Sequence, residues 1–266
     1  MKHVQILIFE IGTGCNLGQA HAGRCPNTHP DRWIGTEGRR PLTDDLILRL
    51  TIEAYEQHGF RGYIGWHLYC EPLLYWDRIR PLMLHIRQRV PDARFLLWTN
   101  GTRLPKPALQ LTIFDQVQVT NYGEADLSAL AGIFNVGRIT SPRWDCRWNT
   151  ATTPGQTSLG CVKPFSEFIV NAYGQVLLCC YDWRGEASIG NVWDRPFGEI
   201  VAAWQAMRDS VAGARMGEDA PARCRRCVMK HDDLSYAFAR RIAAESAGYR
   251  TTLLAQSITN LLEGQP

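Results

Sequence analysis

The chain has 266 residues, 45% of them hydrophobic, which is enough for one α/β domain with an appendage and a substantial core. Its net charge is only +3 and its lysines and arginines are scattered, so composition favours neither a nucleic-acid nor a membrane-surface partner. No apolar run approaches the roughly 20 residues that span a bilayer, and no signal-peptide pattern precedes the first strand, so we expect a cytoplasmic protein. Thiols stay reduced in that compartment, and nine clustered cysteines therefore indicate metal ligation rather than disulfides.

The chain begins with a strand that runs into a cysteine loop. Val4 to Ile11 reads VQILIFEI, the continuous apolar pattern of a strand covered on both faces. Gly12 and Gly14 let the backbone turn, and Cys15 and Cys25 follow. Ligands concentrate at the C-terminal ends of parallel strands, so these two thiols form a candidate soft-metal site. Two cysteines do not complete a metal's shell, and a pair of reduced loop cysteines is the plainer alternative.

The rest of the first half alternates between helical and strand patterns. Helices are predicted from Thr43 or Asp44, either of which would cap the start, to Gly59, then over 76–90 and 124–134. Strands are predicted at about 62–69, 94–99, 114–123 and 135–140. This alternation predicts an α/β fold with a parallel sheet and right-handed crossovers, curled or closed into a partial (β/α) TIM-like barrel. Polar residues follow the strands, which indicates one shared site.

The alternation stops at about residue 140. The segment that follows is rich in Pro, Gly, Thr and Trp, and a β-hairpin is then predicted around Asn171 to Gly174. A helix from Phe197 to about Val211 comes next, and the tail over 232–262 is mostly helical in pattern. We therefore divide the chain into a barrel core over 1–142, a small hairpin-and-helix domain over 143–231, and a helical tail over 232–266.

The second half carries its own set of cysteines. Cys224-x-x-Cys227 can grip one side of a metal, Cys161 precedes the hairpin, and Cys179 and Cys180 end it. Neighbouring residues of a strand point to opposite faces, so only one of the last two would bind, and we favour Cys179. Structural zinc is the alternative to an iron–sulfur cluster here.

Several short motifs together make the chain resemble the radical S-adenosylmethionine superfamily, in the branch with a C-terminal Twitch domain, the shortened relative of the SPASM domain. In the first half these are GCN at 14–16 with RCP at 24–26, CEPLL at 70–74 in place of Gly-Glu-Pro, TNGT at 99–102 and TNYG at 120–123. In the second half C-x17-C, GQVLLCCYDW, IGNVWD and CRRC are similar to the auxiliary-cluster region of a Twitch dehydrogenase that acts on an aminocyclitol. The match covers most of residues 4–227, and the motifs fall in order at strand ends.

The resemblance implies two [4Fe–4S] clusters, one at the first cysteine loop with an open iron for S-adenosylmethionine and one auxiliary cluster. Reductive cleavage of the sulfonium would release a 5′-deoxyadenosyl radical, which removes a hydrogen from the substrate. Glu71 would accept hydrogen bonds from the methionine ammonium, and Thr99, Asn100 and Thr120 would face its carboxylate and the ribose. A helix-end charge and an ordinary turn are the alternatives for Glu71 and Asn100. An electron donor such as flavodoxin or ferredoxin is implied, and no residue is assigned as catalytic.

The first cysteine loop departs from the family's C-x3-C-x2-C pattern. Cys15 and Cys25 form C-x9-C, and Thr28 stands where the third cysteine would fall. Imidazole can replace thiolate on iron, although it raises the reduction potential and so disfavours sulfonium cleavage. The candidates for the third ligand are His29, Cys70 and His21.

The substrate class follows from the resemblance and from this unusual loop. SPASM and Twitch enzymes commonly modify ribosomally made precursor peptides, so we predict a peptide maturase, with splicease-type backbone excision as one such reaction. A separate small leader-recognition protein is then expected as a partner. The alternatives are a small-molecule alcohol dehydrogenase of the aminocyclitol type, a non-catalytic metal-stabilised partner protein, and a zinc-stabilised scaffold.

Overall fold

The computed structural model describes residues 1–19, 25–29, 32, 36, 38–105, 107–122, 128–130, 136–140, 163–187 and 189–213. The strands are β1 (Ile6–Phe9), β2 (Tyr63–Gly65), β3 (Arg94–Thr99), β4 (Gln116–Thr120), β5 (Val136–Thr140), β6 (Glu167–Val170), β7 (Gln175–Leu177) and β8 (Gly190–Asn191). The helices are α1 (Asp44–Glu56), α2 (Trp76–Arg89), α3 (Lys163–Ser166) and α4 (Phe197–Gly213). Short 3-10 helices are η1 (Pro26–Thr28), η3 (Pro72–Tyr75), η4 (Ala108–Ile113) and η5 (Ser128–Leu130).

All eight described strands form one sheet in the order β5-β4-β3-β2-β1-β6-β7-β8. The pairs from β5 through β1 to β6 are parallel, whereas β6-β7 and β7-β8 are antiparallel. The sheet is therefore open, with β5 and β8 at its two edges, and the predicted α/β class with a mainly parallel sheet is confirmed. Because β6 pairs directly with β1, the predicted hairpin of the second half continues the sheet of the first half.

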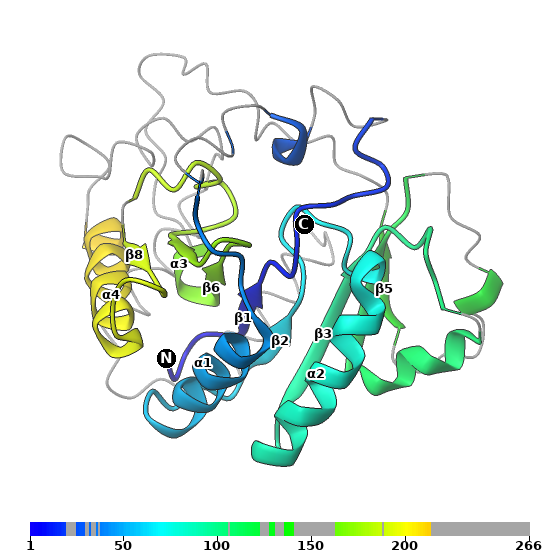
Figure 1. Cartoon of the computed structure of the whole chain (residues 1–266), viewed down its shortest axis with the longest axis horizontal. Helices are drawn as coiled ribbons and strands as arrows, with labels where there is room; N and C mark the ends of the chain where they lie inside the picture. The colour runs from blue at the N-terminus through cyan, green and yellow to red at the C-terminus, as the bar shows by residue number, and fades with distance from the viewer. Residues whose placement is uncertain are drawn as a thin grey trace.

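One face of the sheet carries the main core. Figure 1 shows α1 and α2 side by side in front of the strands, with α4 beside β8 and β6 at the other end. Apolar residues of the strands, of these helices and of the segments between them form one buried group, of which Trp66 and Trp204 are the largest fully buried members. The opposite face holds a much smaller buried group of Ile8, Ile169 and Leu177. Helices thus cover one face of the sheet.

Several local signals act as predicted. The Thr43 hydroxyl accepts a hydrogen bond from the backbone N–H of Leu46 at 3.3 Å and caps α1. Gly174 takes a φ of +83° in the β6-β7 turn, which favours glycine. The described part of the helix predicted over 124–134 is only the 3-10 turn η5, and the tail predicted over 232–262 lies outside the described residues.

Strand β2 ends at Gly65, earlier than the predicted limit near Tyr69. The reason lies in the hydrogen bonds of the segment that follows. The backbone N–H of Tyr69 donates to the Glu10 side chain at 3.2 Å instead of to a neighbouring strand. The chain therefore leaves the ladder and carries Cys70 and Glu71 to the edge where β1 also ends.

Close packing of β1 against β2 depends on Gly62. An ideal Cβ on Gly62 would lie 2.1 Å from the carbonyl oxygen of Gln5, and backbone cannot move away as a flexible side chain can. We expect Gly62→Ala to lower the free energy of unfolding by about 1–3 kcal/mol or more. Gly198→Ala is the matched control, because its Cβ would lie 3.6 Å from the nearest atom, within α4. This second change should stabilise the protein by about 0.5–1 kcal/mol, as judged by denaturant unfolding.

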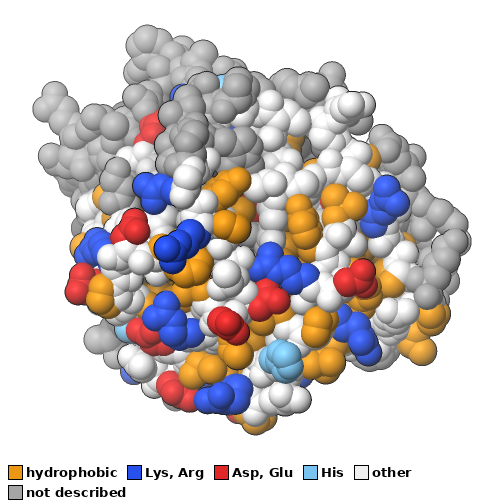
Figure 2. All heavy atoms as spheres, in the orientation of Figure 1, with side chains coloured by type: hydrophobic (Ala, Val, Ile, Leu, Met, Phe, Trp, Pro, Cys, Tyr) orange, Lys and Arg blue, Asp and Glu red, His pale blue; other side chains and the backbone are white. Residues whose placement is uncertain are grey.

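The outer face of the helices is mixed in charge. Figure 2 shows basic and acidic side chains interspersed with hydrophobic ones over the face that α1 and α2 present. This pattern agrees with the scattered charge of the sequence. Among the described helices, none has the length and apolar character needed to cross a bilayer.

Candidate cofactor and metal site

Glu71 is the centre of a polar network at the C-terminal ends of β2 and β3. It caps η3 from an extended backbone conformation and is only 2% exposed. Its carboxylate accepts three hydrogen bonds: from the backbone N–H of Leu73 at 3.0 Å, the Thr99 hydroxyl at 2.6 Å and the backbone N–H of Asn100 at 2.8 Å. Burial raises the pKa of Glu71, and these three donors oppose that rise. The predicted group of Glu71, Thr99 and Asn100 therefore comes together in the fold.

The turn after β3 ties this network to the first cysteine loop. Gly101 has a φ of +78°, which turns the chain sharply after Asn100, whose side chain is buried. The Asn100 amide nitrogen donates to Asn16 Oδ1 at 3.1 Å, and Asn16 Nδ2 donates to the Thr102 hydroxyl at 2.7 Å. Thr102 also donates from its backbone N–H to Asn100 Oδ1 at 2.9 Å. Asn16, the residue after Cys15, is thus fixed by the end of β3.

The start of the cysteine loop packs on Tyr75 of η3. The backbone N–H of Gly14 donates to the Tyr75 hydroxyl at 2.7 Å, and the Gly14 carbonyl accepts from the Glu71 N–H at 2.9 Å. A Cβ on Gly12 would lie 2.2 Å from Tyr75 Cζ, so the approach requires glycine there. The sequence suggested only that Gly12 and Gly14 allow a turn; the structure shows that they also admit the tyrosine ring.

Cys15 and Cys25 lie close enough to influence each other electrostatically, and both are partly exposed. Burial raises the pKa of Cys15, and the charges of Glu71 and Cys25 raise it further, while hydrogen bonds from Leu17 and Asn100 act in the opposite direction. Cys25 precedes η1, and the Thr28 hydroxyl donates to its carbonyl at 2.9 Å. The residue in the vacant third position is therefore engaged with the backbone of Cys25.

No third metal ligand is assembled beside these two thiols within the described residues, where no group of three His, Cys, Asp or Glu side chains could hold a metal ion. The His29 ring packs on the Trp183 ring with centroids 4.9 Å apart. Cys70 is buried, and its thiol lies 3.5 Å from the Trp66 carbonyl oxygen. His21 lies outside the described residues. The donor set fits two of the three thiolate positions of a site-differentiated iron–sulfur cluster, and the third ligand stays a prediction.

Cys15 and Cys70 should differ in how fast their thiols react with an alkylating reagent. Burial, together with the charges of Glu10 and Glu71, raises the pKa of Cys70 far above its usual range, so iodoacetamide should not modify it in the folded protein. Cys15 is partly exposed, and because its pKa is raised, its alkylation should accelerate as the pH rises from 7 towards 9 and above. Mass-spectrometric mapping of time-resolved alkylation tests both statements. Fast labelling of Cys70 in the folded apo-protein would contradict them.

Thr120 lies away from the Glu71 network. It ends β4, and its hydroxyl accepts a hydrogen bond from Trp98 Nε1 at 2.9 Å. Thr99 pairs with Val119, so Thr120 shares a face of the sheet with Trp98 and Gln118 rather than with Thr99. The structure thus brings three of the four predicted cofactor-binding residues together and places Thr120 on the other face.

The choice between Cys179 and Cys180 relied on strand alternation, and that argument is wrong. Strand β7 ends at Leu177, so both cysteines lie in the bend beyond it, where neighbouring side chains need not oppose each other. Cys179 is 9% exposed, Cys180 is more exposed, and the Cys180 carbonyl accepts a hydrogen bond from the Tyr69 hydroxyl. The other predicted ligands of this set, Cys161, Cys224 and Cys227, lie outside the described residues.

Sequence reasoning missed Glu10, Asn16 and Tyr75. Glu10 is the single charged residue in the run Val4 to Ile11, which was read only for its apolar character. A charge inside a doubly covered strand needs a buried partner, and this was the available signal. For Asn16 and Tyr75 no local pattern indicates the contacts, because their partners lie 84 and 61 residues away along the chain.

Comparison with known proteins places the second set of cysteines in a recognised class of domain. Residues 161–228 match the SPASM family, an iron–sulfur cluster-binding domain. The matched segment runs from Cys161 to just beyond Cys227 and includes the β6-β7 hairpin. The match supports an iron–sulfur cluster over structural zinc in this region.

Over most of its length the chain has a fold similar to that of BtrN. The structure of BtrN in complex with AdoMet and 2-DOIA is 20% identical, with a TM-score of 0.61 over 78% of this chain and 87% of the BtrN chain. Selenomethionine BtrN in an open conformation is 19% identical, with a TM-score of 0.58 over 85% of this chain and 92% of that one. At these identities the likeness establishes the fold. No curated protein sequence matches the chain significantly.

Proposed function

We propose that the chain is a radical S-adenosylmethionine enzyme. The observation that carries the proposal is the buried Glu71 carboxylate, held by the end of β3 and bonded through its own backbone to the loop of Cys15. The SPASM match adds an iron–sulfur domain, and the fold is shared with BtrN, which was crystallised with AdoMet.

The Glu71 carboxylate has room for one more donor. An ionised carboxylate offers about four lone-pair positions. Three are taken by Leu73, Thr99 and Asn100, two of these donors on Oε1 and one on Oε2. The remaining position, on Oε2, suits an ammonium group such as that of S-adenosylmethionine. In this role Glu71 binds and orients the cofactor, and the three donors hold the carboxylate still.

The other residues of the site position the metal-binding loop. Cys15 and Cys25 would supply two thiolates to a [4Fe–4S] cluster, and the Asn16-Asn100-Thr102 hydrogen bonds hold the segment next to Cys15 in place. When bound, this cluster with S-adenosylmethionine supplies a 5′-deoxyadenosyl radical that removes a hydrogen atom from the substrate. The SPASM-type region would hold the auxiliary cluster through Cys161, Cys179, Cys224 and Cys227, and a flavodoxin or ferredoxin would deliver the electron.

Two substrate classes have support. The atypical C-x9-C loop supports a precursor peptide, whose maturation would involve a separate leader-recognition protein. The likeness to BtrN, solved with the small molecule 2-DOIA, favours oxidation of a small polar molecule, and this is the stronger of the two observations because it extends over most of both chains.

Anaerobic reconstitution with iron and sulfide tests the proposal. We expect a brown protein with about eight irons per chain, which forms 5′-deoxyadenosine from S-adenosylmethionine when dithionite is added. Incubation with deuterated aminocyclitols in one arm and deuterated peptides in another distinguishes the substrates, because deuterium appears in 5′-deoxyadenosine only from the right one. A colourless zinc protein, or the complete lack of 5′-deoxyadenosine in every arm, would refute the enzyme.

A further inference from the structure

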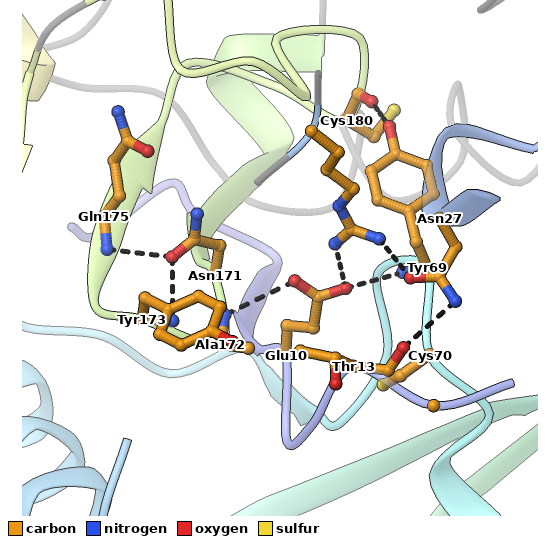
Figure 3. A network of polar contacts seen from close by, with 12 residues as sticks. Glu10, Thr13, Asn27, Tyr69, Cys70, Asn171, Ala172, Tyr173, Gln175 and Cys180 are labelled. Atoms are coloured by element: carbon orange, nitrogen blue, oxygen red, sulfur yellow. Dashed lines mark hydrogen bonds and ion pairs between the residues drawn. The ribbon is translucent and has the colours of Figure 1, made fainter. Parts of the chain in front are cut away.

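Glu10 is a fully buried carboxylate just beyond the end of β1. It accepts hydrogen bonds from the Arg32 guanidinium, from the backbone N–H of Tyr69 at 3.2 Å and from the backbone N–H of Ala172 at 3.3 Å. Figure 3 shows Glu10 between Tyr69, from the segment after β2, and Ala172, from the β6-β7 turn. A buried carboxylate is costly without such partners, and among the described residues Arg32 supplies its cationic partner.

Arg32 connects Glu10 to the cysteine loop. It is only 5% exposed, and its Nη1 donates to Asn27 Oδ1 at 2.6 Å. The Asn27 amide nitrogen in turn donates to the Thr13 carbonyl at 3.0 Å, as Figure 3 shows. Thr13 lies two residues before Cys15, and Asn27 lies two residues after Cys25. Through Asn27, the guanidinium thus connects the residue two before Cys15 to the residue two after Cys25.

The same guanidinium reaches the second half of the protein through Tyr69. Arg32 Cζ lies 4.4 Å from the centroid of the Tyr69 ring, in cation–π geometry. The Tyr69 hydroxyl donates to the carbonyl of Cys180, in the bend after β7 (Figure 3). Arg32 therefore contacts a side chain that is bonded to the loop of the other cysteine set.

From these contacts we infer that Arg32, paired with Glu10, is a positioning residue for the first metal site. It ties the chain beside Cys25 to the chain beside Cys15 through Asn27, and through Tyr69 it fixes this loop against the bend that carries Cys180. The C-x9-C loop separates its two cysteines by nine residues. In a shorter loop the backbone itself keeps the two thiols close together, whereas this loop needs side-chain contacts to do so. The inference rests on the proposed function only for the identity of the metal.

Hydrogen exchange of the full apo-protein tests the positioning without any metal. In Arg32→Ala and Asn27→Ala, we expect the amides of residues 13–19 and 25–29 to exchange about tenfold faster than in the wild type. Asn27 is only half-buried and its removal leaves the Glu10–Arg32 pair in place, so Asn27→Ala should keep the wild-type global unfolding. This variant decides the question if Arg32→Ala fails to fold.

Iron retention of the reconstituted full chain is the second readout. Support of a ligand by its neighbours is worth roughly tenfold to a hundredfold in metal affinity, so both variants should lose the first cluster to a chelator that much more readily. Arg32→Lys should recover part of the lost iron retention. Lysine keeps the positive charge beside Glu10, but it lacks the planar guanidinium that bonds Glu10 and Asn27 at the same time.

Arg61→Ala is the matched control. Arg61 also lies over a tyrosine ring, 5.5 Å from the centroid of Tyr55, and donates to backbone carbonyls, but it does so at the other end of β2. Arg61→Ala should lower the stability of the protein without speeding the exchange of the amides of residues 13–19 and 25–29. Unchanged exchange and unchanged iron retention in Arg32→Ala and Asn27→Ala would overturn the inference. If the wild type held no iron at Cys15 and Cys25, the proposed function would fail, yet the exchange comparison would still decide this inference.

Discussion

Glu71→Ala is expected to abolish binding of S-adenosylmethionine and to lower the free energy of unfolding by about 3 kcal/mol or more, because each buried donor left without a partner costs about 1–3 kcal/mol. The change leaves the Thr99 hydroxyl and the N–H groups of Leu73 and Asn100 without their acceptor. It also removes the position that would receive the cofactor's ammonium. Equilibrium dialysis with S-adenosylmethionine and denaturant unfolding measure the two effects.

Glu71→Gln sharpens this test because it keeps the shape of the side chain. Oε1 can still accept from Leu73 and Thr99, but the amide nitrogen then faces the N–H of Asn100, a donor against a donor. We expect a loss of about 1–3 kcal/mol in stability and a large loss of cofactor affinity. Glu56→Ala, at an exposed glutamate that ends α1, should change stability by less than about 0.5 kcal/mol. Normal cofactor binding by the Glu71 variants would show that the ammonium binds elsewhere.

The same carboxylate predicts a pH dependence. Burial raises the pKa of Glu71 in the folded protein above its ordinary value of 4.5, so above that pH the native state keeps a proton that the unfolded chain has lost. This contribution to stability is therefore complete at low pH and is lost as the pH rises through the folded pKa. Relative to Glu71→Gln, the wild type should lose stability from pH 4.5 towards neutrality, while its affinity for S-adenosylmethionine rises as the carboxylate ionises. A flat difference across this range would contradict the assignment.

Cys15→Ser and Cys25→Ser should each remove about four irons per chain and all formation of 5′-deoxyadenosine, while the iron of the SPASM-type region stays. The two thiols are the described donors of the first cysteine loop, and neither has a neighbouring cysteine in that loop that could replace it. Iron and sulfide assays on the reconstituted variants measure the loss.

Matched substitutions then identify the third ligand. His29→Ala, Cys70→Ser and His21→Ala, assayed in the same way, should leave one variant that behaves like Cys25→Ser. Cys70→Ser should retain full iron if the buried thiol stays where the structure places it, bonded to the Trp66 carbonyl. Cys179→Ser separates the two sites, since Cys179 is the proposed auxiliary ligand and its loss should affect only the auxiliary iron. Retention of all iron by Cys15→Ser and Cys25→Ser together would refute a cluster at this loop.

Most strand and helix assignments of the first half were predictable because each depends on neighbours in the sequence, whereas the helix predicted over 124–134 is described only as the 3-10 turn η5. Apolar runs and helical periodicity indicate which residues are buried. Thr43 indicates the start of a helix, and Gly174 indicates a turn with positive φ. The end of β2 was not predictable, since it depends on Glu10 competing for the N–H of Tyr69 from 59 residues away. The alternation argument for Cys179 and Cys180 failed because β7 ends at Leu177, before either cysteine, although its partner β6 extends to Glu167.

What the sequence by itself determined is the chemistry available at the strand ends: the thiols of Cys15 and Cys25, the carboxylate of Glu71, and the polar turn at Thr99 and Asn100. Only the tertiary structure decided which of these meet. The strand order places β1 between β2 and β6, so Glu10 reaches Ala172 across 162 residues, and β3 next to β2, so Asn100 reaches Glu71. Local patterns carry backbone preference and burial, whereas the partner of a strand is set by the packing of the whole sheet, and that packing joins the cysteine loop to both halves of the protein.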